Sequence, residues 1–342
     1  MKIYCWEGYN QIEYLKNYPI KINTNSFISD FLIADDIRKK NISCNLININ
    51  NAYIRDYLWK YNLIKELNYN KYSSLYSDYP TNFLYLSRWT KSIDRKKIIG
   101  IGQRFGNLNY VINSNSIMQK TAEQEGYNLI KDKKNKYGIL LFEDFNIMQI
   151  SLSCGVNPFK KLTNDEVLKF KKNCKLWFQN ATLISDNYMV LNKFLNKKKI
   201  DLYLTGGTYT CSIARRQGFN NILSIVPKNK VNKLKQGIIF TEITSILKKN
   251  YLPNYENFLD YMLNSQKCYE IAMSKYTCNP VLQMGNSKIF RLFSNKDLNI
   301  IQWNSLQNSS IFSHEYQIIP NYKRLLTILR NTLSLYSKKL CK

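Results

Sequence analysis

Strand-like and helical segments alternate along this chain of 342 residues, and that alternation restricts the possible folds more than any other feature. The stretches 2–6, 20–27 and 44–50 are short, largely apolar runs typical of strands, and a segment with helical period follows each of them. In strand–helix–strand units of this kind, right-handed crossovers connect parallel strands of one sheet. We therefore expect an α/β fold with mostly parallel sheets flanked by helices.

A second set of similar segments follows further along the chain. The apolar run 137–144 predicts a buried strand with an acidic end, and 201–207 predicts another strand that ends at two glycines. Between them, Thr163 and Glu166 have the spacing of a capping box at the start of a long helix. The chain therefore predicts two α/β lobes.

Two extended segments, 97–112 and 236–246, are expected to connect the lobes, because no helix interrupts either of them. The first consists of two extended runs separated by glycines. A chain of this length also exceeds what one hydrophobic core usually fills. Lobes joined in this way have a cleft between them, where ligands bind. We expect lobe one to comprise 1–103 with 238–300, and lobe two 104–237 with 301–342.

The formal net charge is +26, from 50 Lys and Arg against 24 Asp and Glu. Such a charge attracts nucleic acid and anionic membrane surfaces. The basic clusters are short, scattered and mostly beside turn residues or at expected helix ends, and no base-reading motif accompanies them. We favour a compositional bias with solvated lysines, and keep a binder of nucleic acid or anionic surfaces as an alternative function.

Neither metal binding nor histidine-dependent chemistry is expected. The eight cysteines form no C-x-x-C pair, and His314 is the only histidine. No apolar run approaches the roughly 20 residues that span a bilayer, and the start of the sequence lacks the features of a signal peptide. We expect the amphipathic segment 322–339 to close the fold rather than to bind a membrane.

The first strand ends in two large aromatic residues, Trp6 and Tyr9, on either side of Glu7 and Gly8. Two interpretations are open. The aromatic rings either complete a hydrophobic core, or they form a platform for a flat or positively charged ligand. We favour the platform, because Gly8 prevents a helix from starting before Tyr9.

Four motifs, in order along the chain, resemble the spermidine/putrescine-binding branch of the type II periplasmic solute-binding proteins, the substrate-capturing subunits of ABC importers. The first is Trp6 with Tyr9, which resembles the Trp-x-x-Tyr element of that branch. The acidic end of "LLFED" supplies Asp144, and Phe240-Thr241-Glu242 resembles an aromatic followed by a ligand-binding aspartate. The last is Tyr276 in "KYTCNPV".

The chain also departs from that family at several positions. Ile147 stands where the family has a second ligand-binding glutamate, and Gly206 or Gly207 stands where it has a tryptophan. The loop after the third strand reads Asn50-Asn51-Ala52 instead of carrying a serine and an aromatic residue. Asn50 and Asn51 are therefore candidates either for turn formation or for hydrogen bonding to a ligand.

The resemblance implies a non-catalytic subunit that captures a polyamine or another small cationic amine in the cleft between two lobes. It implies a monomer that works with permease subunits at the outer face of the cytoplasmic membrane, without cofactor or metal. The ligand-binding residues that we expect are Trp6, Tyr9, Asn50, Asn51, Asp144, Phe240, Glu242 and Tyr276.

Three residue assignments keep an alternative. Trp6 is either platform or core, Asp144 either binds the ligand or caps the next helix, and Tyr276 is one of 26 tyrosines. An enzyme on the same two-lobed scaffold is a further alternative function. It would need a reactive cysteine or histidine in the cleft, and strand alternation points the nearby Cys5 away from Trp6.

Overall fold

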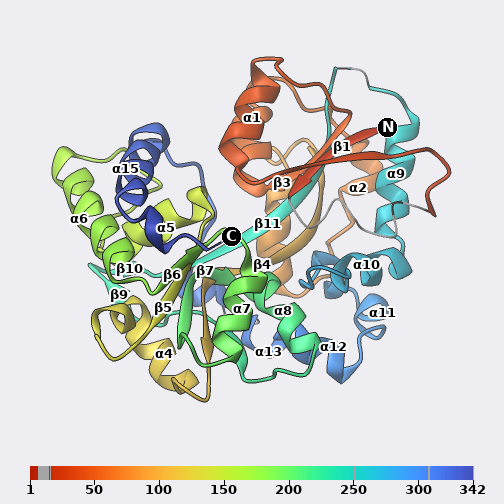
Figure 1. Ribbon diagram of the computed structural model, residues 1–342. Coiled ribbons are helices and arrows are strands. Elements are labelled where there is room, and N and C mark those ends of the chain that lie inside the picture. The colour runs from red at the N-terminus through yellow and green to blue at the C-terminus, as the bar shows by residue number, and fades with distance from the viewer. Residues whose placement is uncertain (7–14, 16, 250, 307–308, 342) are drawn as a thin grey trace. The chain divides into compact units, whose positions relative to one another are not determined.

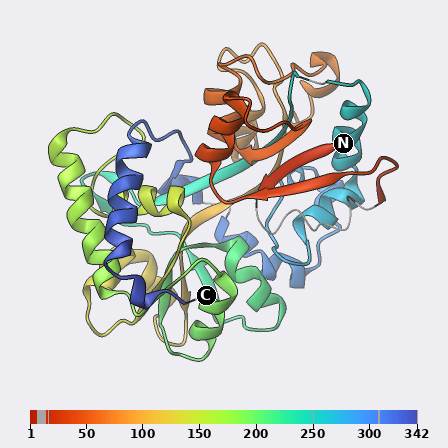
Figure 2. The ribbon, with the colours of Figure 1, turned by 45° about the horizontal axis from the view of Figure 1, so that its top comes forward.

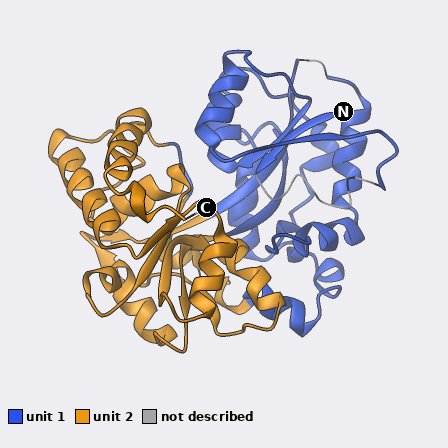
Figure 3. Ribbon diagram, viewed as in Figure 1, with its two compact units in different colours: residues 1–106, 240–303, 316–318 blue, residues 107–239, 304–315, 319–342 orange. Residues whose placement is uncertain are grey.

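The computed structural model describes residues 1–6, 15, 17–249, 251–306 and 309–341. Tyr9 and most of the helix expected over 10–18 therefore lie outside the described residues. The chain divides into two compact units, coloured separately in Figure 3. Unit 1 comprises Met1–Gly106, Phe240–Trp303 and Tyr316–Ile318; unit 2 comprises Asn107–Ile239, Asn304–Glu315 and Ile319–Lys342. The sequence predicts that all of 301–342 belongs to lobe two, whereas in the structure residues 301–303 and 316–318 belong to unit 1.

Unit 1 is built on parallel strands, as the alternation of its sequence predicts. The strands are β1 (Lys2–Trp6), β2 (Asn23–Phe27) and β3 (Leu46–Asn50), with β1 in the middle. The long strand β11 (Gly237–Ile246) continues the sheet by pairing antiparallel with β3, which places Glu242 opposite Asn50.

Strand β4 (Ile101–Asn113) corrects one expectation, because it is a single strand of 13 buried residues and not two runs separated by glycines. Its glycines let another segment approach closely. A Cβ on Gly102 would lie 2.7 Å from Leu282 Cδ2, and a Cβ on Gly106 would lie 2.9 Å from Asn279 Oδ1. Because this segment packs against the strand, the glycines preserve the strand instead of ending it.

Unit 2 has a mixed sheet in which β4 is antiparallel to β7 (Leu202–Gly207), and β7 is parallel to β5 (Tyr137–Leu140). Strand β6 (Leu183–Ser185) lies at the edge beside β5. The remaining strands of this unit are β8 (Ile222–Ile225), which pairs with β4, β12 (Ser313–Glu315), which pairs with β11, and the hairpin of β9 (Lys230–Val231) and β10 (Leu234–Lys235).

Helices flank the strands of each unit (Figure 1). Those of unit 1 are α1 (Asp30–Arg38), α2 (Tyr69–Tyr72), α3 (Thr81–Ser87), α9 (Asn254–Leu263), α10 (Ser265–Ala272), α11 (Ser287–Phe290) and α12 (Asn295–Ile300). Those of unit 2 are α4 (Gln119–Glu125), α5 (Glu143–Ser153), α6 (Asn164–Asn180), α7 (Tyr188–Asn196), α8 (Thr208–Arg216), α14 (Ser309–Phe312) and α15 (Tyr322–Ser334). Helix α13 (Trp303–Leu306) includes the boundary between the units.

Three helices of unit 2 lie side by side, α5, α6 and α15, as Figures 1 and 2 both show. Helix α6 starts with the capping box of Thr163 and Glu166 that the sequence predicts. Leu325, Leu326 and Leu329 of α15 are buried, so this helix covers the core with its apolar face. The C-terminal helix therefore forms part of the core of unit 2.

Candidate functional site

Two of the predicted residues of unit 1, Trp6 and Asn50, donate hydrogen bonds to the carboxylate of Asp30, the first residue of α1. Trp6 Nε1 donates a hydrogen bond to Asp30 Oδ1 at 2.9 Å. Asn50 Nδ2 and the Tyr316 hydroxyl both donate to Asp30 Oδ2, each at 2.7 Å. Because Asp30 is fully buried, these bonds replace the water that its oxygens lose on folding. The negative charge also lies at the N-terminal end of a helix, where it is favourable.

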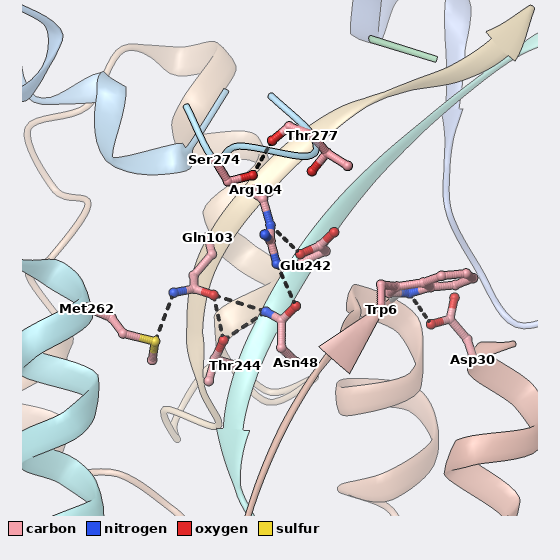
Figure 4. Close-up of polar contacts among 10 residues, drawn as sticks. All are labelled: Trp6, Asp30, Asn48, Gln103, Arg104, Glu242, Thr244, Met262, Ser274 and Thr277. Atoms are coloured by element: carbon pink, nitrogen blue, oxygen red, sulfur yellow. Dashed lines mark hydrogen bonds and ion pairs between the residues drawn. The ribbon is translucent and has the colours of Figure 1, made fainter. Parts of the chain in front are cut away.

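Trp6 is buried at the end of β1. Its side chain is 7% exposed, and its ring lies 5.3 Å from that of Phe27, its register partner on β2. In this arrangement the indole contributes to the interior of unit 1, as the core interpretation expects, while Nε1 holds Asp30 (Figure 4). The platform interpretation of Trp6 stays a prediction.

The two asparagines after β3 have different environments. Asn51 uses both ends of its amide, since Nδ2 donates to the Tyr316 carbonyl at 2.9 Å and Oδ1 accepts from the Thr241 backbone at 3.2 Å. Asn50 Nδ2 faces Asp30, and no donor among the described residues reaches Asn50 Oδ1. A buried acceptor without a donor costs free energy unless a ligand or water supplies one. Asn50 is therefore the stronger candidate of the two.

Glu242 lies in a buried ion pair that the sequence did not predict. Arg104 Nε is 2.8 Å from Glu242 Oε2, and the two side chains are only 2% and 3% exposed. Arg104 Nη2 also donates to Asn48 Oδ1 at 3.2 Å. Asn48 in turn donates to Thr244 at 2.8 Å and to Gln103 at 3.1 Å, which extends the network across β3, β4 and β11 (Figure 4). The positive charge of Arg104 therefore neutralises the negative charge of the Glu242 carboxylate.

The predicted aromatic residues beyond β1 differ in exposure. Phe240 is 4% exposed on β11, two residues before Glu242 and therefore on the same face of the strand. Tyr276 is 39% exposed, and the ammonium of Lys275 lies 5.7 Å from its ring centroid. Of the predicted residues that the structure describes, Tyr276 is the most accessible.

Asp144 belongs to unit 2, where it is the second residue of α5. The N-cap residue of that helix is Phe142, so Asp144 does not occupy the capping position. Its side chain is buried and accepts a hydrogen bond from the Tyr322 hydroxyl of α15. Glu143 beside it forms an ion pair with Arg330 at 2.6 Å.

The structure brings three predicted residues together around one that was not predicted. Trp6 and Asn50 bind Asp30 directly, and Asn51 joins through Tyr316. A sequence signal for Asp30 exists, because Ser29 is a typical N-cap and its hydroxyl accepts from the Leu32 backbone. Arg104 also had a signal, as a lone basic residue in an apolar run.

Glycine at the end of β7 has a steric explanation. The family that the sequence resembles has a tryptophan at this point, where this chain has Gly206 and Gly207. A Cβ on Gly207 would collide with the backbone oxygen of Asn107. A tryptophan at Gly207 is therefore excluded by the backbone of unit 2 itself.

An enzyme on this scaffold would need a reactive cysteine or histidine, and neither Cys5 nor His314 is activated. Burial raises the pKa of Cys5 to about 12, with Arg104 lowering and Glu242 raising it, so the thiol is protonated at neutral pH. Burial and Lys235 lower the pKa of His314, which keeps the imidazole neutral. Among the described residues there is no cluster of three potential metal ligands, and no helix has the length and apolar character needed to cross a membrane.

Comparison with known proteins shows the fold at low sequence identity. No family model matches the chain, and no curated protein matches it in sequence. Among solved structures, a protein of Listeria monocytogenes that carries the name of a spermidine/putrescine ABC transporter is 14% identical, with a TM-score of 0.70 over 98% of both chains. The spermidine/putrescine substrate-binding protein of Streptococcus pneumoniae, solved with calcium and HEPES, is 14% identical, with a TM-score of 0.66 over 98% of both chains.

A third similar structure binds a different class of ligand. The maltotriose-binding protein of Thermus thermophilus, solved with maltotriose, is 9% identical, with a TM-score of 0.65 over 99% of both chains. The expected fold is thus confirmed: the chain has the two-lobed α/β fold of type II periplasmic binding proteins. Two proteins with this fold carry spermidine/putrescine names and a third holds maltotriose, so the fold alone leaves the ligand open.

Proposed function

We propose that the chain is the non-catalytic substrate-binding subunit of an ABC importer, acting with permease subunits at the outer face of the cytoplasmic membrane. The observation that carries the proposal is the agreement of fold over the full length of substrate-binding proteins, with 98% of both chains covered. The protonated Cys5 thiol and neutral His314 support a binding role over an enzymatic one.

For the ligand we propose a small cationic amine. An amine needs carboxylates or neutral acceptors for its charge and aromatic faces for its carbon atoms. Asn50 Oδ1 is a buried acceptor without a donor among the described residues, and Tyr276 offers a partly exposed ring. Two similar structures carry spermidine/putrescine names, which also supports an amine.

The ion pair of Glu242 narrows the class of amine. A ligand ammonium at Glu242 would have to share the carboxylate with Arg104, 2.8 Å away. Ile147 also replaces the second acidic residue of the family motif, which leaves Asp144 as the remaining predicted carboxylate. Since each buried ammonium needs its own acceptor, we propose a ligand with one ammonium group in preference to spermidine.

A ligand panel with paired tyrosine variants tests both the solute-binding function and the proposed class of ligand. The panel contains putrescine, spermidine, basic amino acids, betaine, thiamine and maltotriose, with thermal unfolding and calorimetry as readouts. A true ligand at a hundred times its Kd should stabilise by about 2.7 kcal/mol. Tyr276→Ala should weaken its binding by about two- to thirtyfold, the worth of one cation–π contact of about 0.5–2 kcal/mol. Tyr69→Ala removes a comparably exposed ring, 47% against 39%, and should change nothing.

The results distinguish a wrong ligand class from a wrong function. Binding of maltotriose instead of any amine would refute the cationic ligand but keep the solute-binding function. Stronger binding of spermidine than of betaine and thiamine, each of which carries one cationic nitrogen at neutral pH, would refute the single-ammonium class. Equal losses in both tyrosine variants would remove Tyr276 from the site, and no response to any compound would count against a binding subunit of this substrate range.

A further inference from the structure

The positive charge of the protein is unevenly shared between units of nearly equal length. Unit 2 contains 27 of the 50 Lys and Arg residues but only 10 of the 24 Asp and Glu residues, a net charge of +17 against +9 for unit 1. A uniform compositional bias would charge both units alike. The excess in unit 2 therefore calls for a local explanation.

Much of the excess lies on two neighbouring helices. The segments 160–180 and 321–341, which contain α6 and α15, hold 11 Lys and Arg residues and 2 Asp and Glu residues. Eight of their ten exposed basic residues define the α6–α15 face: Lys161, Lys169, Lys171, Lys172, Lys175, Lys323, Arg324 and Lys338. The other two, Lys160 and Arg330, form ion pairs with acidic groups nearby, since Glu166 lies 3.5 Å from Lys160 and Glu143 lies 2.6 Å from Arg330. Asp165 is exposed and lines the groove between the two helices, where basic residues outnumber it.

The face also exposes leucines and contains a groove. Leu168 is 49% exposed and Leu335 is 73% exposed, although both helices bury a complete apolar stripe elsewhere. An open groove of about 570 Å³ runs between α6 and α15, with Leu168 and Ile328 among its apolar lining and Lys171 and Arg324 as its cations. The helices are fastened to one another by Arg324, which donates to Asn164 Oδ1 at 3.2 Å, so the face is a defined surface.

We propose that the α6–α15 face binds the surface of an anionic lipid bilayer. Lipid phosphates complement the lysines and Arg324, and the exposed leucines enter the boundary between headgroups and acyl chains. Nucleic acid fits less well, because proteins bind it with aromatic and polar side chains beside the cations, and the large exposed side chains here are leucines. The buried leucines of α15 take no part, since they cover the core.

The inference is independent of the ligand proposed above, and vesicle sedimentation tests it without any amine. The full chain is mixed with vesicles of phosphatidylcholine alone or with 30% phosphatidylglycerol. We expect binding to the anionic vesicles only, with affinity that falls as salt rises, since each cation near such a surface contributes roughly a fivefold factor. A variant with Lys169, Lys171, Lys172 and Lys175 changed to Gln should bind at least tenfold more weakly.

A matched variant carries the same charge change on unit 1, with Lys60, Lys96, Lys288 and Lys296, all exposed, changed to Gln. This variant should bind anionic vesicles less than threefold more weakly than the parent protein. Should the α6 variant fold poorly by circular dichroism, Lys323→Gln with Arg324→Gln and Lys338→Gln tests the other helix. Leu335→Ser should weaken vesicle binding but not retention on a DNA duplex. Equal losses in the two lysine variants, equal binding to both vesicle types, or tighter binding to DNA than to anionic vesicles would each overturn the proposal.

Discussion

Arg104 and Glu242 form a buried charge pair whose energetics differ from those of the surface ion pairs. Removing both charges from water costs several kcal/mol per ion, and the pair recovers this only through good geometry and further hydrogen bonds. Asn48 supplies one such bond, to Arg104 Nη2. The pair is therefore better explained as a device that fixes how β3, β4 and β11 align than as a source of net stability.

Glu242→Gln should destabilise unit 1 by about 3–5 kcal/mol, because it leaves the guanidinium of Arg104 buried without its counter-charge. Replacing both residues together, Arg104→Met with Glu242→Leu, should cost much less, since no charge stays uncompensated. Urea unfolding followed by circular dichroism gives both values. Similar midpoints for Glu242→Gln and the parent protein would show that water or a rearranged partner reaches Arg104.

The predicted site residues show what sequence reasoning can and cannot reach. Trp6, Asn50 and Glu242 lie at or near one another in unit 1 because strand ends and register place them there. The resemblance identified Trp6 and Glu242, whereas Asn50 became a candidate from a loop that departs from the family. Their polar partners were not found. Asp30 and Tyr316 are 286 positions apart, and Arg104 and Glu242 are 138 apart, so no local period connects them.

At the level of elements, α1 is tied to the following π-helix, Tyr53–Leu58, through Asp35. Asp35 accepts from Arg38 at 2.7 Å, from Lys39 at 2.6 Å and from the Tyr57 hydroxyl at 2.9 Å. Burial raises the pKa of this carboxyl, but the hydrogen bonds from Lys39, Arg38 and Tyr57 outweigh it and lower the pKa to about 2. The ionised carboxylate therefore holds two elements together.

That depressed pKa predicts the direction of an acid effect. Because Asp35 ionises more readily in the folded chain than at its ordinary pKa of 3.8, its contribution is fully present above that value and is lost as the pH falls toward 2. The parent protein should exceed Asp35→Asn in unfolding free energy at pH 6, and the difference should shrink between pH 4 and pH 2. Urea unfolding across that range measures it, and a difference that grows on acidification would refute the assignment.

Elements with strong local signals were predicted well, and those shaped by tertiary contact were not. The capping box of α6 and its buried stripe of Val167, Phe170, Cys174 and Trp177 follow from spacing alone. The segment after β3 has the expected helical period, but it winds as a π-helix that buries Tyr53 and Leu58. The glycines of β4 predict breaks in the strand, but in the structure they allow close packing by residues 279–282, more than 170 positions away.

For the whole molecule, the charge distribution has a consequence for stability. A net charge of +26 repels itself in the folded state, and the repulsion within unit 2, which carries +17, exceeds that within unit 1, which carries +9. The Debye length falls from about 30 Å at 0.01 M to about 8 Å at 0.15 M salt, which removes repulsion between helices but leaves buried pairs such as Arg104 with Glu242 almost untouched. Screening should therefore stabilise the fold.

We expect the Tm to rise by several degrees when NaCl increases from 10 to 300 mM, and to rise less in the variant with four α6 lysines changed to Gln, because part of the repulsion is already gone. At 10 mM NaCl that variant should melt above the parent protein, and above the matched unit 1 variant, whose lysines lie in weaker positive potential. Differential scanning calorimetry measures all three chains. A Tm that falls with salt would mean that exposed ion pairs, such as Lys97 with Glu66 at 2.8 Å, outweigh the repulsion, and equal shifts in the two variants would mean that the excess charge of unit 2 has no local effect.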